Sequence, residues 1–152
     1  MPVVRRFPKT AGIVYELSLT LELPAGESAG SAMNALAPCA EALHTPGRSD
    51  ETDAGALAGA PLISTWLPVV VADGNDLEAR RGRLDGALHA GAALPAGVGV
   101  GHAIAQALGG RYGLSHGAMN ALSLGFARLS SSVRRAAQAG SARMSWIIRV
   151  LM

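Results

Sequence analysis

Apolar and polar residues alternate near the start of the chain. From Tyr15 to Leu23 every second position is apolar, and the positions between them hold Glu, Ser or Thr. A period of two is typical of a β-strand that buries one face. Pro24 and Gly26 follow directly and end the pattern, as expected of residues that favour turns. We therefore predict one N-terminal β-strand segment over residues 15–23.

Beyond this segment, apolar positions recur at three- and four-residue intervals, which indicates helices. Capping residues and breakers set the limits of five predicted helices: Ser28 to Leu43, about Thr52 to Val71, Asn75 to Pro95, residues 102–110 closed by Gly109 and Gly110, and His116 onward after a Ser115 cap. Prolines within the first two helices are expected to interrupt them, at a cost of about 3 kcal/mol each: Pro38, Pro61 and Pro68. The pattern predicts a mainly α fold.

The predicted helix after Asn75 has two distinct faces. Glu78 lies three residues beyond Asn75, the spacing of a capping box. Leucines and small residues form the stripe expected to face the core: Leu77, Leu84, Leu88, Ala87 and Gly91. Three arginines lie close together at Arg80, Arg81 and Arg83. We interpret them as a solvent-facing helix surface rather than as a binding patch.

Composition favours one core built from small side chains. The 152 residues are 49% hydrophobic and include 19 Gly but only two each of Trp, Tyr and Phe, which favours closely packed helices over an aromatic sandwich. Cys39 is the single cysteine, so an intrachain disulfide and a Cys-rich zinc site are excluded. No apolar run approaches about 20 residues, so we expect no membrane span and a cytoplasmic location.

Charge divides the chain into two parts. Residues 1–85 hold seven Lys or Arg and all eleven Asp or Glu, whereas residues 86–152 hold six Arg and no acidic residue. A basic stretch of this kind can bind nucleic acid or an anionic membrane. Aromatic residues that could stack on bases are nearly absent from it, so nucleic acid is not the partner that we expect.

Two histidines are placed to meet. His102 and His116 are 14 residues apart, each near the start of a predicted short helix, with a glycine-rich turn between the helices. If the helices pack as a hairpin, both imidazoles enter the same cleft. A helix N-terminus favours a neutral, metal-binding ring at His116, but a metal site needs more than two ligands. On the residues alone, the pair is either structural or part of a site.

The run around these histidines, GHAIAQALGGRYGLSHGAMNALSL, resembles the metal-site segment of the iron-containing alcohol dehydrogenase family. His102 and His116 match the family's first and third metal-binding histidines. Upstream, SAMNALAPCAEAL resembles the helix that carries an Asp, or an Asn in the maleylacetate reductase-like branch, and a His four residues later. Asn34 takes the first of these places and Pro38 the second.

The resemblance implies site residues. His102, His116 and Asn34 would hold a metal, with iron or zinc as the ion. Because Pro38 cannot coordinate, such an ion would be bound weakly. Gln106 stands where the family often has a further active-site histidine, and it is expected to orient the substrate through its amide.

The resemblance covers roughly residues 10–124 and implies a helical metal-domain fragment of the dehydroquinate synthase-like/iron-containing alcohol dehydrogenase fold. Residues 1–24 would be a remnant of the link to a nucleotide-binding domain, residues 25–124 a partial helical domain, and residues 125–152 a basic tail. The implied activity is NAD(P)-dependent hydride transfer on a small alcohol or carbonyl substrate, as in an alcohol dehydrogenase or a maleylacetate reductase. The domain that would hold NAD(P) is missing from this sequence, so we expect a truncated, inactive chain.

Two alternatives stay open on the sequence. The chain could be a non-enzymatic helical interaction module, whose partner is a second copy of itself or a chain that completes the fold. The basic tail could bind nucleic acid or an anionic membrane surface. The simultaneous loss of resemblance and of acidic residues also suggests that the reading frame shifts near residue 125, with a genuine basic helix as the competing hypothesis.

Overall fold

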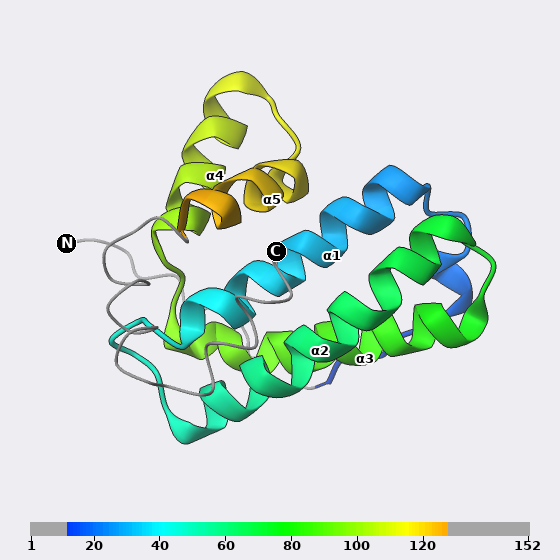
Figure 1. Cartoon of the computed structure of the whole chain (residues 1–152), viewed down its shortest axis with the longest axis horizontal. Coiled ribbons are helices and arrows are strands. Elements are labelled where there is room, and N and C mark those ends of the chain that lie inside the picture. The colour runs from blue at the N-terminus through cyan, green and yellow to red at the C-terminus, as the bar shows by residue number, and fades with distance from the viewer. Residues whose placement is uncertain (1–11, 128–152) are drawn as a thin grey trace.

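The computed structural model describes residues 12–127, with side chains up to Leu124. Two short 3-10 helices, η1 (Ser18–Thr20) and η2 (Leu94–Ala96), accompany the α-helices α1 (Ala25–Ala42), α2 (Asp50–Ala72), α3 (Leu77–Ala93), α4 (Val100–Tyr112) and α5 (His116–Ala127). Helices α1, α2 and α3 lie side by side, and α4 and α5 form a hairpin against α1 (Figure 1). The predicted mainly α fold is confirmed. The basic tail lies outside the described residues.

The predicted strand over residues 15–23 is not confirmed. Residues 17–23 turn through backbone hydrogen bonds that join positions three apart, such as the Thr20 N–H to the Leu17 carbonyl at 3.0 Å. A strand needs a neighbouring strand to pair its backbone groups, and the described part of the chain contains none. The alternating leucines are therefore not one buried face, and Leu19 is 81% exposed.

Two helix starts differ from the prediction. Ser28 does not cap α1 but lies inside it, where its buried hydroxyl donates a hydrogen bond to the Leu23 carbonyl at 3.2 Å. Helix α3 is capped by Asp76 rather than by Asn75, because the Asp76 carboxylate accepts a hydrogen bond from the Ala79 N–H at 2.9 Å. Helix α1 thus begins after Pro24 without a side-chain cap, whereas several polar residues precede α3 and the fold decides which of them caps it.

The end of α4 also lies further on than predicted. The helix runs through Gly109 and Gly110 and ends at Gly113, whose φ of 66° lies in the left-handed region that favours glycine. The predicted start of α5 after Ser115 is confirmed, and the Ser115 carbonyl accepts a hydrogen bond from the Met119 N–H at 2.9 Å. The tight turn between these residues makes the hairpin.

The prolines do not interrupt the long helices. Pro38 lies inside α1, and Pro61 and Pro68 lie inside α2, which begins with a capping box formed by Ser49 and Thr52. Each interior proline removes one backbone hydrogen bond. Packing along the rest of these helices outweighs that local cost, since tertiary contacts supply most of the stability of a helix.

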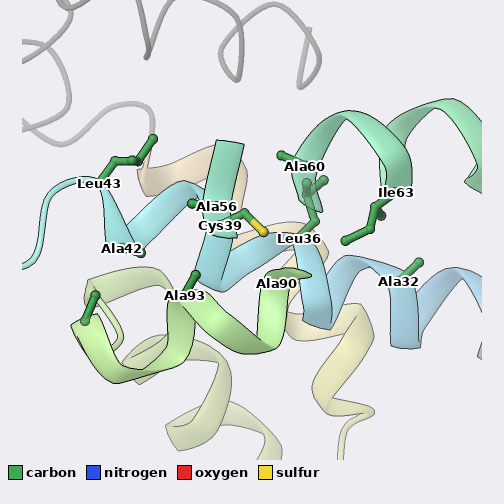
Figure 2. Packing of buried hydrophobic residues seen from close by; sticks show 11 residues of the cluster. Ala32, Leu36, Cys39, Ala42, Leu43, Ala56, Ala60, Ile63, Ala90 and Ala93 are labelled. Carbon is green, nitrogen blue, oxygen red and sulfur yellow. The ribbon is translucent and has the colours of Figure 1, made fainter. Parts of the chain in front are cut away.

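The core lies between α1, α2 and α3 and is made of small side chains (Figure 2). Leu36, Leu43 and Ile63 are its larger members, and Cys39 belongs to the same cluster. Burial raises the pKa of Cys39 to about 12, which keeps the thiol protonated and unreactive at neutral pH. Most of the remaining members are alanines: Ala32, Ala42, Ala56, Ala60, Ala90, Ala93 and Ala96.

Glycines allow α2 and α3 to approach at backbone distance. A Cβ added to Gly59 would lie 2.8 Å from the Ala90 nitrogen and 2.8 Å from the Gly86 carbonyl oxygen. A Cβ added to Gly86 would lie 2.8 Å from Cγ1 of Ile63. Contacts this short exclude any larger residue unless the helices separate.

The buried face of α3 is not the leucine stripe that the sequence predicted. Leu77 and Leu88 are 52% and 49% exposed. The buried positions instead hold small residues and two arginines: Ala79, Arg80, Gly82, Arg83, Gly86, Ala90 and Ala93. A leucine face would hold the two backbones apart, so the small-residue face is the one that fits against α2.

Two of the three arginines of α3 are buried, against the prediction of a solvent-facing group, whereas Arg81 is exposed as predicted. Arg80 is 1% exposed, and its guanidinium donates hydrogen bonds to the carbonyls of Gly74, Leu21 (3.3 Å) and Leu23 (3.2 Å). Arg83 is 6% exposed and donates a hydrogen bond to a serine hydroxyl on α1. Burial, and then the charge of Arg80, lower the pKa of Arg83. Arg80 thus ties the segment before α1 to the α2–α3 turn.

Helix α2 is longer and more apolar than the prediction about membrane spans assumed. Of the described helices, α2 is long and apolar enough to cross a membrane by length and composition alone, and the bent pair Leu77–Ala96 and Val100–Tyr112 passes the same test together. Core helices meet this criterion as well, and α2 packs against both α1 and α3. One third of its apolar window, 33%, is buried. The cytoplasmic location stays a prediction.

Replacing Arg80 should destabilise the fold. In Arg80→Met, the three carbonyls lose a charged donor, and we expect the free energy of unfolding to fall by about 2 kcal/mol or more. The matched control is Arg81→Met, since Arg81 is the exposed neighbour and should change stability by less than about 0.5 kcal/mol. Urea denaturation of both variants measures the difference, and equal losses would contradict the assigned role of Arg80.

Candidate functional site

The α4–α5 hairpin brings the two predicted histidines into contact. His102 lies in the first turn of α4, and His116 is the first residue of α5. Their Nε2 atoms are 3.2 Å apart. The rings meet edge to face, with centroids 4.9 Å apart and an interplanar angle of 72°. The two imidazoles meet as the hairpin arrangement predicted.

Close packing of α5 on α1 adds a pair of asparagines. A Cβ on Gly117 would overlap the backbone of Gly30, so glycine at position 117 allows the two helices to touch. About one turn further along each helix, Asn120 Nδ2 donates a hydrogen bond to Asn34 Oδ1 at 2.7 Å. Sequence reasoning missed Asn120. Its spacing of four residues from His116 places both on one helix face and could have revealed it.

Asn34, His102 and His116 line one pocket of about 400 Å³. Its polar lining comes from α1, α4 and α5 and comprises Asn34, His102 and His116, the three residues predicted as metal ligands. The other lining residues come from α1, α3, η2 and the segment before η1: Ile13, Tyr15, Ala35, Pro38, Ala87, Ala90, Gly91 and Leu94. Apart from the Tyr15 hydroxyl, this second group is apolar. The pocket therefore combines a small polar group with apolar walls, as sites for small molecules do.

A buried carboxylate holds the helix that carries His102. Glu41, at the end of α1, accepts hydrogen bonds from the Gly99 N–H at 2.9 Å and from the His102 N–H at 3.0 Å. These N–H groups belong to the N-terminus of α4, where the helix dipole also favours a negative charge. A Cβ on Gly99 would lie 2.9 Å from the Glu41 carboxylate. Glu41 thus positions His102, a role that the sequence did not indicate.

The hydrogen-bond partners of the rings indicate where their protons lie. Nδ1 of His102 is buried and has no hydrogen-bond partner within the described residues. In proteins, a buried N–H group without an acceptor is rarer than a buried acceptor without a donor. We therefore infer that Nδ1 of His102 is unprotonated and that the ring carries its proton on Nε2. His102 Nε2–H then donates to His116 Nε2, and His116 carries its own proton on Nδ1. The two rings form a hydrogen-bonded pair.

The donor set does not fit a resident metal ion. Two nitrogens bound to one tetrahedral zinc lie about 3.4 Å apart, close to the 3.2 Å between the two Nε2 atoms, so the imidazoles alone would suit an ion. Asn34 Oδ1, however, already accepts from Asn120. No group of three His, Cys, Asp or Glu side chains that could hold an ion occurs among the described residues. The implied metal site therefore has no third ligand of these types among the described residues.

Of the two other positions that the resemblance singled out, Pro38 lines the pocket and Gln106 does not. Pro38 lines the pocket four residues after Asn34 on α1, and His102 and His116 line the same pocket. Gln106 is exposed on α4 and is not among the residues that line the pocket. Its role in orienting a substrate stays a prediction.

The sequence matches a model of the Fe-containing alcohol dehydrogenase family, C-terminal, over residues 28–152. The chain belongs to this family. The match includes residues 125–152, which we separated as a basic tail. The boundary at residue 125 and the frame-shift hypothesis stay predictions. Membership also confirms the resemblance found around His102 and His116.

Curated relatives within the family are oxidoreductases. The chain is 36% identical to the NAD-dependent methanol dehydrogenase of Bacillus methanolicus over 126 residues, which cover 82% of this chain and 33% of that protein. It is 35% identical to maleylacetate reductase 1 of Cupriavidus pinatubonensis over 118 residues, which cover 77% of this chain and 33% of that protein. The chain spans about a third of the length of the curated relatives that it matches.

Solved structures of this family share the helical arrangement. A 1,3-propanediol oxidoreductase is 31% identical, with a TM-score of 0.75, over 90% of this chain and 35% of that one. Sulfoacetaldehyde reductase from Bifidobacterium kashiwanohense, solved in complex with NAD+, is 28% identical, with a TM-score of 0.71, over 75% of this chain and 31% of that one. The described helices therefore have the fold of the C-terminal domain of this family.

Removing the charge of Glu41 should loosen the first turn of α4. In Glu41→Gln, one carboxylate oxygen becomes an NH2 group that faces a backbone N–H donor, and we expect a loss of about 2 kcal/mol in the free energy of unfolding. Hydrogen exchange should quicken at the amides of Gly99 and His102 in particular. Glu22→Gln, at an exposed glutamate, is the control. A stability loss no larger than that of the control would contradict the capping role.

Proposed function

We propose that this chain provides the substrate-binding helical part of an oxidoreductase that acts on a hydroxyl or carbonyl group. The observation that supports this most directly is the meeting of His102, His116 and Asn34, from three different helices, in one pocket with apolar walls. The family membership adds support, because its named relatives include alcohol dehydrogenases and maleylacetate reductases.

The polar group of the pocket suits an oxygen atom of a substrate. Because Asn34 Oδ1 accepts from Asn120, the Asn34 Nδ2 group remains as a hydrogen-bond donor to a molecule in the pocket. The proton between the two imidazoles supplies a second donor when His102 turns from His116 to the substrate oxygen. Two donors of this kind polarise a carbonyl and favour the negative charge that builds up on its oxygen during reduction.

In the direction of alcohol oxidation, the same groups would receive a proton. If NAD(P)+ is bound, it would take a hydride from the substrate carbon as the C–O bond becomes a carbonyl. The hydroxyl proton would pass to Nε2 of His116, the accepting nitrogen of the pair, and then to solvent. The nicotinamide dinucleotide supplies the hydride acceptor. The described residues contain no strand followed by a glycine-rich phosphate loop, so other residues than these would hold that cofactor.

We expect the 152-residue chain by itself to show no turnover. With NAD+ and a panel of short alcohols, the formation of NADH should not exceed that of the His102→Ala/His116→Ala variant. Absorbance at the NADH band measures this. A rate above the variant would show that the chain holds the cofactor itself and would contradict this expectation.

Binding of a small alcohol tests the proposed function without the cofactor. When 1-propanol is titrated into 15N-labelled protein, the backbone amide signals of Ala35 and Gly91, which line the pocket, should shift in a saturable way. Asn34→Leu removes a donor to the oxygen and should raise the midpoint roughly tenfold, the equivalent of about one hydrogen bond. Asn75→Leu, at an exposed asparagine outside the pocket, is the control. No saturable shift in the wild-type chain would contradict the proposal.

The incomplete donor set leads to a second expectation, that Zn²⁺ or Fe²⁺ binds this chain only weakly. Pro38→His would place a third imidazole on the pocket wall and should tighten Zn²⁺ binding roughly tenfold or more. Pro68→His makes the same exchange at an exposed proline inside α2 and controls for the removal of a helix proline. Calorimetric titration gives the affinities. Equal affinities for the wild type and Pro38→His would show that the wild-type site is already complete.

A further inference from the structure

Two buried arginines lie three residues apart on α3, away from the histidine pocket. Arg80 is 1% exposed and Arg83 is 6% exposed, and a spacing of three places both side chains on the same side of the helix. Neither arginine lines the pocket that holds His102 and His116. A guanidinium is always protonated in proteins. This side of α3 therefore carries two positive charges that are largely removed from water.

The hydrogen bonds of the two arginines leave donors unused. Arg80 donates through Nε and Nη2 to three main-chain carbonyls, but its buried Nη1 has no hydrogen-bond partner. Arg83 donates through Nη1 to the Ser31 hydroxyl at 3.2 Å, and its buried Nε has no partner. Buried N–H groups without a partner are rare in proteins, and they indicate a bound water molecule or ion.

No acidic side chain of the protein neutralises the two arginines. All eleven Asp and Glu lie within residues 16–85, and the structure describes every one of them. None forms an ion pair with either arginine, whereas Asp53 pairs with Arg48. Burial, and then the charge of Arg80, lower the pKa of Arg83, and no carboxylate of the described chain acts in the opposite direction. Water could accept from the unused N–H groups, but it would leave two like charges buried together, which is strongly unfavourable.

Ser31 lies where the buried arginines come nearest to solvent. It is exposed on α1, its hydroxyl donates to the Ser28 carbonyl at 3.1 Å, and its oxygen accepts from Arg83. The guanidinium of Arg83 therefore ends close to the surface between α1 and α3. An ion that enters there reaches a charged donor directly, and charge-assisted hydrogen bonds are stronger than those between neutral groups.

We infer that Arg80 and Arg83 form a binding site for a small inorganic anion such as chloride. The anion accepts from their unused N–H groups and supplies the negative charge that the side chains of the chain do not. It thereby joins α3 to α1 and to the segment before α1, whose carbonyls already accept from Arg80. Because both arginines are almost fully buried, a large organic anion such as gluconate is excluded.

Thermal unfolding of the full chain tests this site. Chloride replaces gluconate stepwise at constant sodium concentration, so the screening of surface charges stays the same. We expect Tm to rise with chloride along a saturable curve. At about ten times Kd, an anion that binds the folded state alone multiplies the folded-to-unfolded ratio by about eleven. A ratio of this size raises Tm by roughly 5 °C in a domain of this length.

Two arginine variants assign the effect to the site. Arg83→Met keeps the length of the side chain without its charge and should abolish the dependence of Tm on chloride. Arg81→Met removes the same charge from an exposed position of α3 and should retain the dependence. Should Arg83→Met fail to fold, the chloride NMR line of the wild-type sample still reports binding. That line should be broadened by the folded chain and should sharpen when urea unfolds it.

Several results would overturn the inference. If chloride neither raises Tm of the wild type above its value in gluconate nor shows a broadened line, water alone meets the unused N–H groups. A rise in Tm that does not saturate would indicate a general salt effect. If Arg83→Met responds to chloride as the wild type does, the anion binds elsewhere. If Arg81→Met loses the response as fully as Arg83→Met, the net charge of the chain is responsible and not the buried pair.

Discussion

Close approach of helix backbones at small residues is the constraint on which the rest of this structure depends. At Gly59 and Gly86, helices α2 and α3 lie too close for any side chain larger than a hydrogen atom. The same holds at Gly117, where a Cβ would overlap the backbone of Gly30 and α5 meets α1. Interiors packed this tightly gain many dispersion contacts even though each side chain is small. A core of alanines is sufficient because the backbones themselves supply much of the contact.

The candidate site follows from the second of these approaches. With α5 held against α1 at Gly117, Asn120 reaches Asn34 one turn further along, and His116 at the start of α5 comes within 3.2 Å of His102. Glu41 completes the arrangement, because its carboxylate ties the first turn of α4 to α1. Three helices are therefore fixed relative to one another before any substrate binds, which is the preorganisation that binding and catalysis require.

Prediction succeeded where local spacing decided the outcome and failed where burial did. The 14-residue interval and the intervening glycines were enough to bring His102 and His116 together, because a short helical hairpin has few arrangements. The choice between the leucine face and the glycine face of α3 could not be made from its own sequence, since both have helical spacing. Arg80 shows the same limit, because an arginine on a helix is solvent-facing unless carbonyls from another segment meet it.

The sequence alone was enough to predict a mainly helical chain with a small-residue core and a meeting of His102 and His116 if their helices pack as a hairpin. These features depend on composition, periodicity and spacing, which are local. The family was indicated by the resemblance of particular motifs and is shown by the family match. Only the tertiary structure decided that residues 15–23 form no strand, that Arg80 and Arg83 are buried, and that Glu41 and Asn120 support the site. The positions of Arg80, Arg83, Glu41 and Asn120 each depend on a hydrogen-bond partner at least 50 residues away. Residues 15–23 have no neighbouring strand among the described residues. Such pairings are set by packing rather than by any pattern within a segment.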